Sequence, residues 1–143
     1  MKIVIDMMGG DNGLLATIPA LKVFAKAHSE IEIFAVGSNL LDEEFKNFSN
    51  VKVVHSTSVL PMDVDPMTAY RTPNSSLMVA TDTYLENKCD ILVSAGSSGA
   101  LMTASIFKIK RINGVIRPAF ITSFPTIKKG KKFVVCDLGA NNA

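Results

Sequence analysis

The sequence has no tryptophan, only two cysteines and no apolar run long enough to cross a bilayer. The missing run excludes an integral membrane protein. An aspartate follows the first three apolar residues after Lys2, which is not the pattern of a signal peptide, and we expect a cytoplasmic location. Cys89 and Cys136 have neither CxxC spacing nor a nearby histidine pair. We therefore predict reduced structural thiols and no metal site.

Acidic residues are scarce in the second part of the chain. Residues 1–90 carry 7 Lys and Arg against 12 Asp and Glu, a net charge of −5, whereas residues 91–143 carry 8 against Asp137 alone, a net charge of +7. Such a basic part can attract nucleic acid, anionic lipid or an acidic protein, or it can be a solvated face that aids only solubility. Nucleic acid is disfavoured because no aromatic residues are interleaved with the lysines.

The remaining composition is that of one globular domain over residues 1–143, with 48% hydrophobic and 20% charged residues. Short β-branched runs alternate with stretches of helical periodicity, which predicts an α/β fold with a Rossmann-like parallel sheet and helices on both faces, in three layers. Several runs are continuously apolar and are predicted to be buried. The predicted strands are Ile3–Ile5, Ile31–Val36, Val51–Val54, Ile91–Val93, Ala119–Ser123 and Phe133–Cys136.

Three apolar sets recur at helical spacing, and each predicts a helix with one face against the sheet. They are Leu14, Ile18, Leu21 and Ala25; Leu77, Ala80 and Tyr84; and Ala100, Leu101, Ala104 and Phe107. Because proline is tolerated only in a first turn, the first helix is expected to begin near Thr17, with Thr17 as its cap and Pro19 just inside it.

Two connections stand out between the predicted elements. The segment from His55 to Asn74 contains three prolines and no clear period, which predicts a long irregular connection of functional use. The segment from Thr126 to Lys132 is expected to form an exposed, hairpin-like turn around Gly130.

Glycine-rich turns follow three of the predicted strands, at Asp6–Asp11, Ser94–Gly99 and Asp137–Asn141. Glycine permits close backbone approach, and amides at a helix start favour an anion, so phosphate or a carboxylate is the expected ligand. Ser97 or Ser98 would also cap the following helix. These turns can equally be plain strand-to-helix connections. The absence of GxxxxGK[ST] and GxGxxG disfavours ATP and NAD.

Arg71 followed by Ser75 and Ser76 is a further candidate phosphate site, because a guanidinium and two hydroxyls at a helix start can hold that anion. A surface arginine before a serine-capped helix would look the same. His55 at a strand end is a candidate general base, although a lone histidine is more often structural.

Read in order, these turns resemble the PlsX family of bacterial phosphate acyltransferases of phospholipid synthesis. Five stretches carry the resemblance across nearly the whole chain: Ile5–Asp11, Ala69–Arg71 with Ser75 and Ser76, Val93–Met102, Arg117–Ala119 and Asp137–Asn141. The chain departs from the family at Ser97-Ser98, in place of Asn-Thr, and at Thr72–Asn74, in place of basic residues. Because the family's enzymes are more than twice this length, we expect the N-terminal part of a larger protein and fold.

The resemblance implies transfer of a fatty acyl group from acyl carrier protein to inorganic phosphate, giving an acyl phosphate. The implied catalytic residues are Arg71, Ser98 and Asn141. The implied phosphate-binding residues are Asp6, Gly9, Gly10, Asp11, Ser75, Ser76, Ser94, Gly96, Ser97, Gly99, Asp137 and Gly139. Phosphate is itself the nucleophile, so the protein needs only to hold it beside the thioester and to stabilise the oxyanion, for which the amides of Gly96 to Gly99 are suited.

The resemblance also implies a homodimer, loose association with membranes and no cofactor. The basic second part would suit docking of acyl carrier protein, which is acidic as a class. Two alternatives stay open. One is a phosphotransacetylase-like enzyme that uses a coenzyme A thioester, and the other is a catalytically incomplete fragment that binds an anion.

Overall fold

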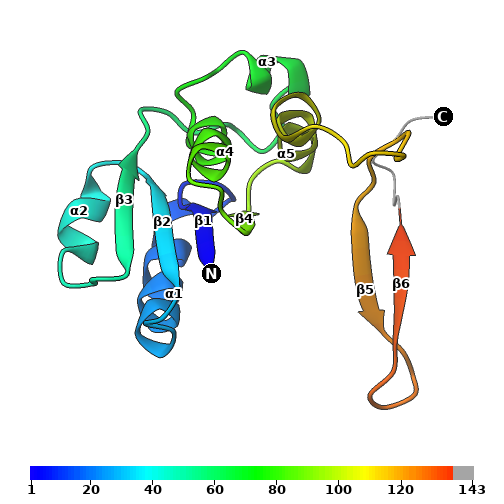
Figure 1. Ribbon diagram of the computed structural model, residues 1–143, viewed down its shortest axis with the longest axis horizontal. Coiled ribbons are helices and arrows are strands. Elements are labelled where there is room, and N and C mark those ends of the chain that lie inside the picture. Colours follow the sequence, from blue (N-terminus) through cyan, green and yellow to red (C-terminus); the bar gives the residue numbers. More distant parts are fainter. Residues whose placement is uncertain (137–143) are drawn as a thin grey trace. The chain divides into compact units, whose positions relative to one another are not determined.

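The computed structural model describes residues 1–136, and the chain divides into two compact units, Met1–Lys110 and Arg111–Ala143. The first unit contains a four-stranded parallel sheet with the strand order β3-β2-β1-β4 (Figure 1). Its strands are β1 (Lys2–Asp6), β2 (Glu32–Gly37), β3 (Val51–His55) and β4 (Ile91–Ser94). Each lies where the β-branched runs predicted a strand, within one or two residues.

Helices connect these strands. They are α1 (Gly13–Ala27), α2 (Leu40–Phe45), α3 (Pro66–Tyr70), α4 (Ser76–Glu86) and α5 (Ser98–Ala104), and α5 continues into a π-helical turn, η1 (Ser105–Ile109). No helix within residues 1–136 is long and apolar enough to span a membrane.

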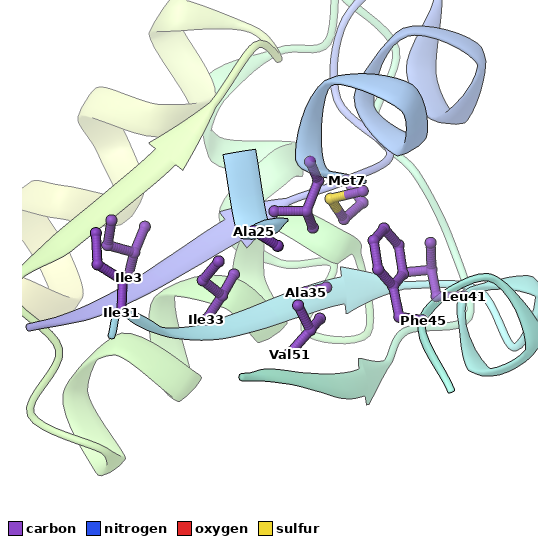
Figure 2. Packing of buried hydrophobic residues seen from close by; sticks show 10 residues of the cluster. Ile3, Met7, Ala25, Ile31, Ile33, Ala35, Leu41, Phe45 and Val51 are labelled. Atoms are coloured by element: carbon purple, nitrogen blue, oxygen red, sulfur yellow. The ribbon is translucent and has the colours of Figure 1, made fainter. Parts of the chain in front are cut away.

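The sheet is covered on both faces, because successive side chains of a strand point to opposite sides. Ile3 of β1 packs with Leu21 of α1 and Leu41 of α2 in one buried cluster, which Figure 2 shows from close by. Val4, the next residue of β1, packs on the other face with Ala80 of α4. The three-layer α/β architecture predicted from the sequence is therefore confirmed.

The start of the first helix differs from the prediction. Helix α1 begins at Gly13, and Pro19 lies in its interior. Thr17 is not a cap: its hydroxyl donates to the carbonyl oxygens of Met7, at 2.7 Å, and Gly13, at 3.1 Å. A proline removes one helical hydrogen bond, and this loss is outweighed by the apolar face of Leu14, Ile18, Leu21 and Ala25 against the sheet.

The connection between β3 and α4 is irregular as predicted, but it contains the short helix α3. Pro66 is the first residue of α3, where its missing N–H costs nothing. The Asp65 carboxylate accepts hydrogen bonds from the Thr68 amide and hydroxyl, and these bonds lower the pKa of Asp65. Ordered backbone therefore replaces part of the loop expected between His55 and Asn74.

The last two strands are not part of the parallel sheet, contrary to the prediction. β5 (Ile121–Pro125) and β6 (Lys132–Cys136) pair antiparallel with each other, joined by the turn predicted around Gly130, whose φ is +77°. Neither strand is buried: Ile121 is 71% exposed and Val134 is 68% exposed. Apolar, β-branched composition predicted the strands correctly but carries no information about their partners.

Both cysteines are free thiols. Cys89 is buried among the α4 cluster, and burial raises the pKa of its thiol, as expected of a structural cysteine. Cys136 at the end of β6 is exposed, so its prediction as a buried structural thiol is wrong.

Candidate functional site at the β1–β4 switch point

The order of the strands creates a switch point between β1 and β4. The chain proceeds outward from β1 to β2 and β3, and then returns to place β4 on the other side of β1. The connections after β1 and β4 therefore leave the sheet in opposite directions, and ligands of open α/β folds bind at such a point. The register pairs Asp6, the last residue of β1, with Ser94, the last of β4. Two of the predicted glycine turns therefore begin side by side.

The Asp6 carboxylate organises both turns. Its Oδ1 accepts hydrogen bonds from the amides of Met8 and Gly9, each at 3.2 Å, within the first turn. Its Oδ2 accepts a hydrogen bond from the Ser94 hydroxyl at 2.8 Å, and the Ser94 oxygen accepts one from the Gly96 amide at 3.1 Å. Asp6 is 2% exposed, and a buried carboxylate needs such donors. One buried side chain therefore links the first turn to the second.

The two turns also touch through their glycines. A Cβ atom on Gly9 would lie 2.7 Å from Asp6 Oδ2 and 2.8 Å from the Gly96 nitrogen, closer than real Cβ contacts. Gly10 has a φ of +89° and approaches the carbonyl oxygen of Ala95. Glycine is required at these positions for close approach and for backbone conformation, respectively.

A small cleft of about 10 Å³ lies where the turns meet the start of α4. Its lining comprises Asp6, Gly9, Val59, Leu60, Ser76, Leu77, Gly96 and Ser97. This volume has room for about one water molecule. Val59 and Leu60 of the β3–α4 connection form the apolar part of the lining together with Leu77.

The two adjacent serines at the start of α4 differ in their surroundings. Ser75 is fully buried, and its hydroxyl donates to the carbonyl of Thr72 at 2.9 Å, which closes the preceding turn. Ser76 is 1% exposed and lines the cleft, and its hydroxyl makes no hydrogen bond to any group in residues 1–136. Among the side chains of residues 1–136, the fully enclosed oxygen without a partner is that of Ser38, so the Ser76 hydroxyl is open to the cleft and is available to a ligand oxygen.

Helix α5 begins at the opposite wall of the cleft. Ser97 is its N-cap, as predicted, and its Oγ accepts a weak hydrogen bond from the Ala100 amide at 3.4 Å. The first turn leaves the amides of Ser98 and Gly99 without partners inside the helix. Polar donors from α4 and α5 therefore flank the cleft, and they suit an oxyanion.

Comparison with known proteins adds to this geometry. Residues 1–143 match the family described as fatty acid synthesis protein. The chain belongs to this family. Among curated members named phosphate acyltransferase, the protein of Exiguobacterium sibiricum is 40% identical over 145 residues, covering 99% of this chain and 44% of that protein. That of Mycoplasmopsis pulmonis is 36% identical over 140 residues, covering 97% and 43%, respectively.

The fatty acid synthesis family thus confirms the resemblance drawn from the turns. The chain spans less than half the length of these curated relatives, which agrees with a match to their N-terminal part.

Within this family member, the structure brings together five of the predicted binding residues: Asp6, Gly9, Ser76, Gly96 and Ser97. The amides of Gly9 and Gly96 are engaged by Asp6 and Ser94. The anion-binding role expected of the Gly96 amide therefore stays a prediction, and in this conformation the amide donates to the Ser94 hydroxyl. Gly10 and Ser94 shape the turns without lining the cleft, whereas Gly99 packs against Pro66, where a Cβ would lie 3.2 Å from the ring.

Three further predicted residues also lie outside the cleft lining. Arg71 ends α3 and is exposed, as are Asp11 and Ser98. His55, the candidate base, is not part of the lining either, and it pairs with Asp42 at 2.8 Å on the surface. Asp137, Gly139 and Asn141 lie outside the described residues, so their predicted roles stay predictions.

Sequence reasoning missed the apolar part of the lining, Val59, Leu60 and Leu77. The length of the His55–Asn74 segment indicated a functional connection, but no local pattern identifies which of its residues covers the cleft. The contact is made between the β3–α4 connection and two turns far from it in sequence, and such contacts appear only in the folded chain.

Proposed function

We propose that the full-length protein containing this chain transfers a fatty acyl group from acyl carrier protein to inorganic phosphate. The observation that carries the proposal is the cleft where two glycine turns meet the start of α4, with the side chains of Ser76 and Ser97 in its lining. The curated names of the relatives support the chemistry. A cytoplasmic location, a homodimer and loose membrane association follow from the family resemblance and remain part of the proposal.

The reaction needs no nucleophile from the protein. An oxygen of hydrogen phosphate attacks the thioester carbonyl, the new C–O bond forms, and the C–S bond then breaks. The proton of hydrogen phosphate passes to the leaving thiolate, and the products are an acyl phosphate and the free carrier thiol. The protein holds the anion beside the carbonyl and stabilises the oxyanion of the intermediate.

Each residue is assigned a role from its position relative to the cleft. Ser76 and Ser97, which line the cleft, bind the phosphate oxygens, and Ser98, outside the lining, keeps the catalytic role that the resemblance implies. The Asp6 carboxylate already accepts three hydrogen bonds, so it orients the turns and does not bind the anion. We assign Asn141 to the thioester carbonyl, and Asp11 and Asp137 to orienting donors.

Arg71 binds phosphate after a movement of the β3–α4 connection. It is the C-cap of α3, on the same connection that contributes Val59 and Leu60 to the cleft lining. A shift of this connection would admit phosphate and carry the guanidinium with it. Replacing Arg71 with Ala is expected to raise the KM for phosphate, and Arg71→Lys is expected to recover part of the loss.

The test compares two adjacent serines in the full-length protein. Ser76→Ala is expected to raise the KM for phosphate about tenfold, the loss of one hydrogen bond to a charged group. Ser75→Ala is the matched control, expected to lower stability with little effect on that KM. Acyl phosphate formation is measured with carrier-bound and coenzyme A thioesters in parallel. Turnover of the coenzyme A thioester alone would favour the phosphotransacetylase-like alternative, and an unchanged KM in Ser76→Ala would refute the role of the cleft.

A further inference from the structure

The end of the β5–β6 hairpin concentrates positive charge without any acidic neighbour in sequence. Lys128, Lys129, Lys131 and Lys132 fall within five residues, and residues 91–136 contain no Asp or Glu. In the described part of the chain none of these four lysines forms an ion pair. Their field is therefore not neutralised locally, and it favours an acidic partner.

The turn that carries the lysines is ordered by its own hydrogen bonds. The Thr126 amide donates to the Lys131 carbonyl at 3.1 Å, and the Lys131 amide donates to the Lys128 carbonyl at 3.0 Å. The Thr126 hydroxyl lies 3.0 Å from the Lys128 carbonyl and 3.1 Å from that of Lys131. The lysines therefore project from a fixed turn, which lowers the entropic cost of binding.

Apolar side chains accompany this charge. Ile127 is fully exposed, and Phe133 is 49% exposed and stacks on Phe124 with ring centroids 5.5 Å apart. An open hollow of about 550 Å³ lies beside them. It is lined by Pro125, Thr126, Ile127, Lys128, Lys131, Lys132 and Phe133. Its lining combines apolar side chains with three lysines, and it is a shallow surface that is open to solvent.

We propose that this hairpin end is the docking surface for the acidic carrier protein that delivers the acyl group. The inference rests on the proposed function. Charge complementarity selects an acidic partner, and the exposed Ile127 and Phe133 beside the lysines offer apolar contact to a protein surface. Docking then combines electrostatic steering by the four lysines with contact of Ile127 and Phe133 in the hollow.

The experiment reverses the charge of the four lysines in the full-length protein, as K128E/K129E/K131E/K132E. The Kd for the acyl-loaded carrier is expected to rise at least about tenfold at low ionic strength, with a smaller difference at high salt. The matched control changes the same four lysines to Arg, which keeps the charge and is expected to keep the Kd within about twofold. Ile127→Ser is expected to weaken carrier binding in a salt-independent way.

The readouts separate failure of this inference from failure of the proposed function. Acyl phosphate formation by the unaltered protein tests the function, whereas the change in carrier Kd tests the docking surface. An unchanged Kd in the charge-reversed protein overturns the inference. So does the loss of binding to anionic phospholipid vesicles without a change in carrier Kd, which would assign the hairpin to a membrane.

Discussion

Gly9 shows how a single residue controls the distance between the two turns of the site. Only glycine fits at this position, because an added Cβ would collide with Asp6 Oδ2 and with the backbone nitrogen of Gly96. The neighbouring carboxylate is held by three donors and cannot move without breaking them. Because the Gly96 nitrogen belongs to the second turn, the two turns must separate to admit a methyl group.

We therefore predict that Gly9→Ala weakens phosphate binding and destabilises the protein by about 1–3 kcal/mol, the usual cost of overpacking. The KM for phosphate and the midpoint of urea unfolding measure the two effects. Gly114→Ala is the control: Gly114 has a φ of +85° but no atom within 4 Å of an added Cβ. That substitution should cost about 1 kcal/mol of backbone strain and leave the KM unchanged. A Gly9→Ala protein with native phosphate affinity would contradict the packing of the turns.

At the scale of the element, α1 contains an interior proline on its exposed side. Pro19 lies well inside a helix that begins at Gly13 and ends at Ala27, and it cannot donate a hydrogen bond to the carbonyl of Leu15. Its ring does not contribute to the apolar cluster beneath the helix. Helix propensity therefore favours Ala at this position.

Replacing Pro19 with Ala is expected to raise the free energy of unfolding by about 1–2 kcal/mol, after allowing for the greater freedom of the unfolded chain. Urea unfolding followed by circular dichroism measures the change. Pro61→Ala is the matched control, because Pro61 lies outside any helix. That variant should show no gain. A Pro19→Ala protein that is no more stable than the unaltered protein would contradict an interior position of Pro19 in α1. It would favour the helix start near Thr17 that the sequence predicted.

Local chemistry made most elements predictable. Continuous apolar runs indicated β1 to β4, and the helical spacing of Leu14, Ile18 and Leu21 indicated α1. The same rules placed the start of α1 too late. Proline is usually avoided inside a helix, so the helix was expected to begin near Thr17, although its apolar face extends back to Leu14. Helix α3 was missed although Asp65-Pro66 is a readable cap and first turn; its five residues are too few for periodicity to register.

The part of the site that lies on the turns directly after β1 and β4 could be predicted from the sequence. In a parallel sheet, the turns after β1 and β4 meet at one edge whenever those strands are neighbours, and their glycines indicated close approach. The distinction between Ser75 and Ser76 was not predictable, because it depends on which hydroxyl the Thr72 carbonyl accepts. The antiparallel pairing of β5 with β6 was missed for a similar reason, since strand direction depends on partners and not on composition.

At the scale of the whole molecule, the buried core belongs to the first unit. All three clusters of buried hydrophobic residues, on both faces of the sheet and between α3, α4 and α5, fall within residues 1–110. Residues 111–136 contribute no buried hydrophobic side chain in the described chain, and their two strands pair only with each other. An isolated two-stranded hairpin is marginally stable in water.

A protein truncated after Lys110 is therefore expected to fold cooperatively, with a single urea transition by circular dichroism. Ile33→Ala in that protein should cost about 2–5 kcal/mol, because Ile33 is fully buried in the first cluster. A peptide of residues 111–143 should show no such transition. Loss of cooperative unfolding on truncation would instead support the single domain over residues 1–143 expected from the sequence, since the two units would then depend on each other for stability.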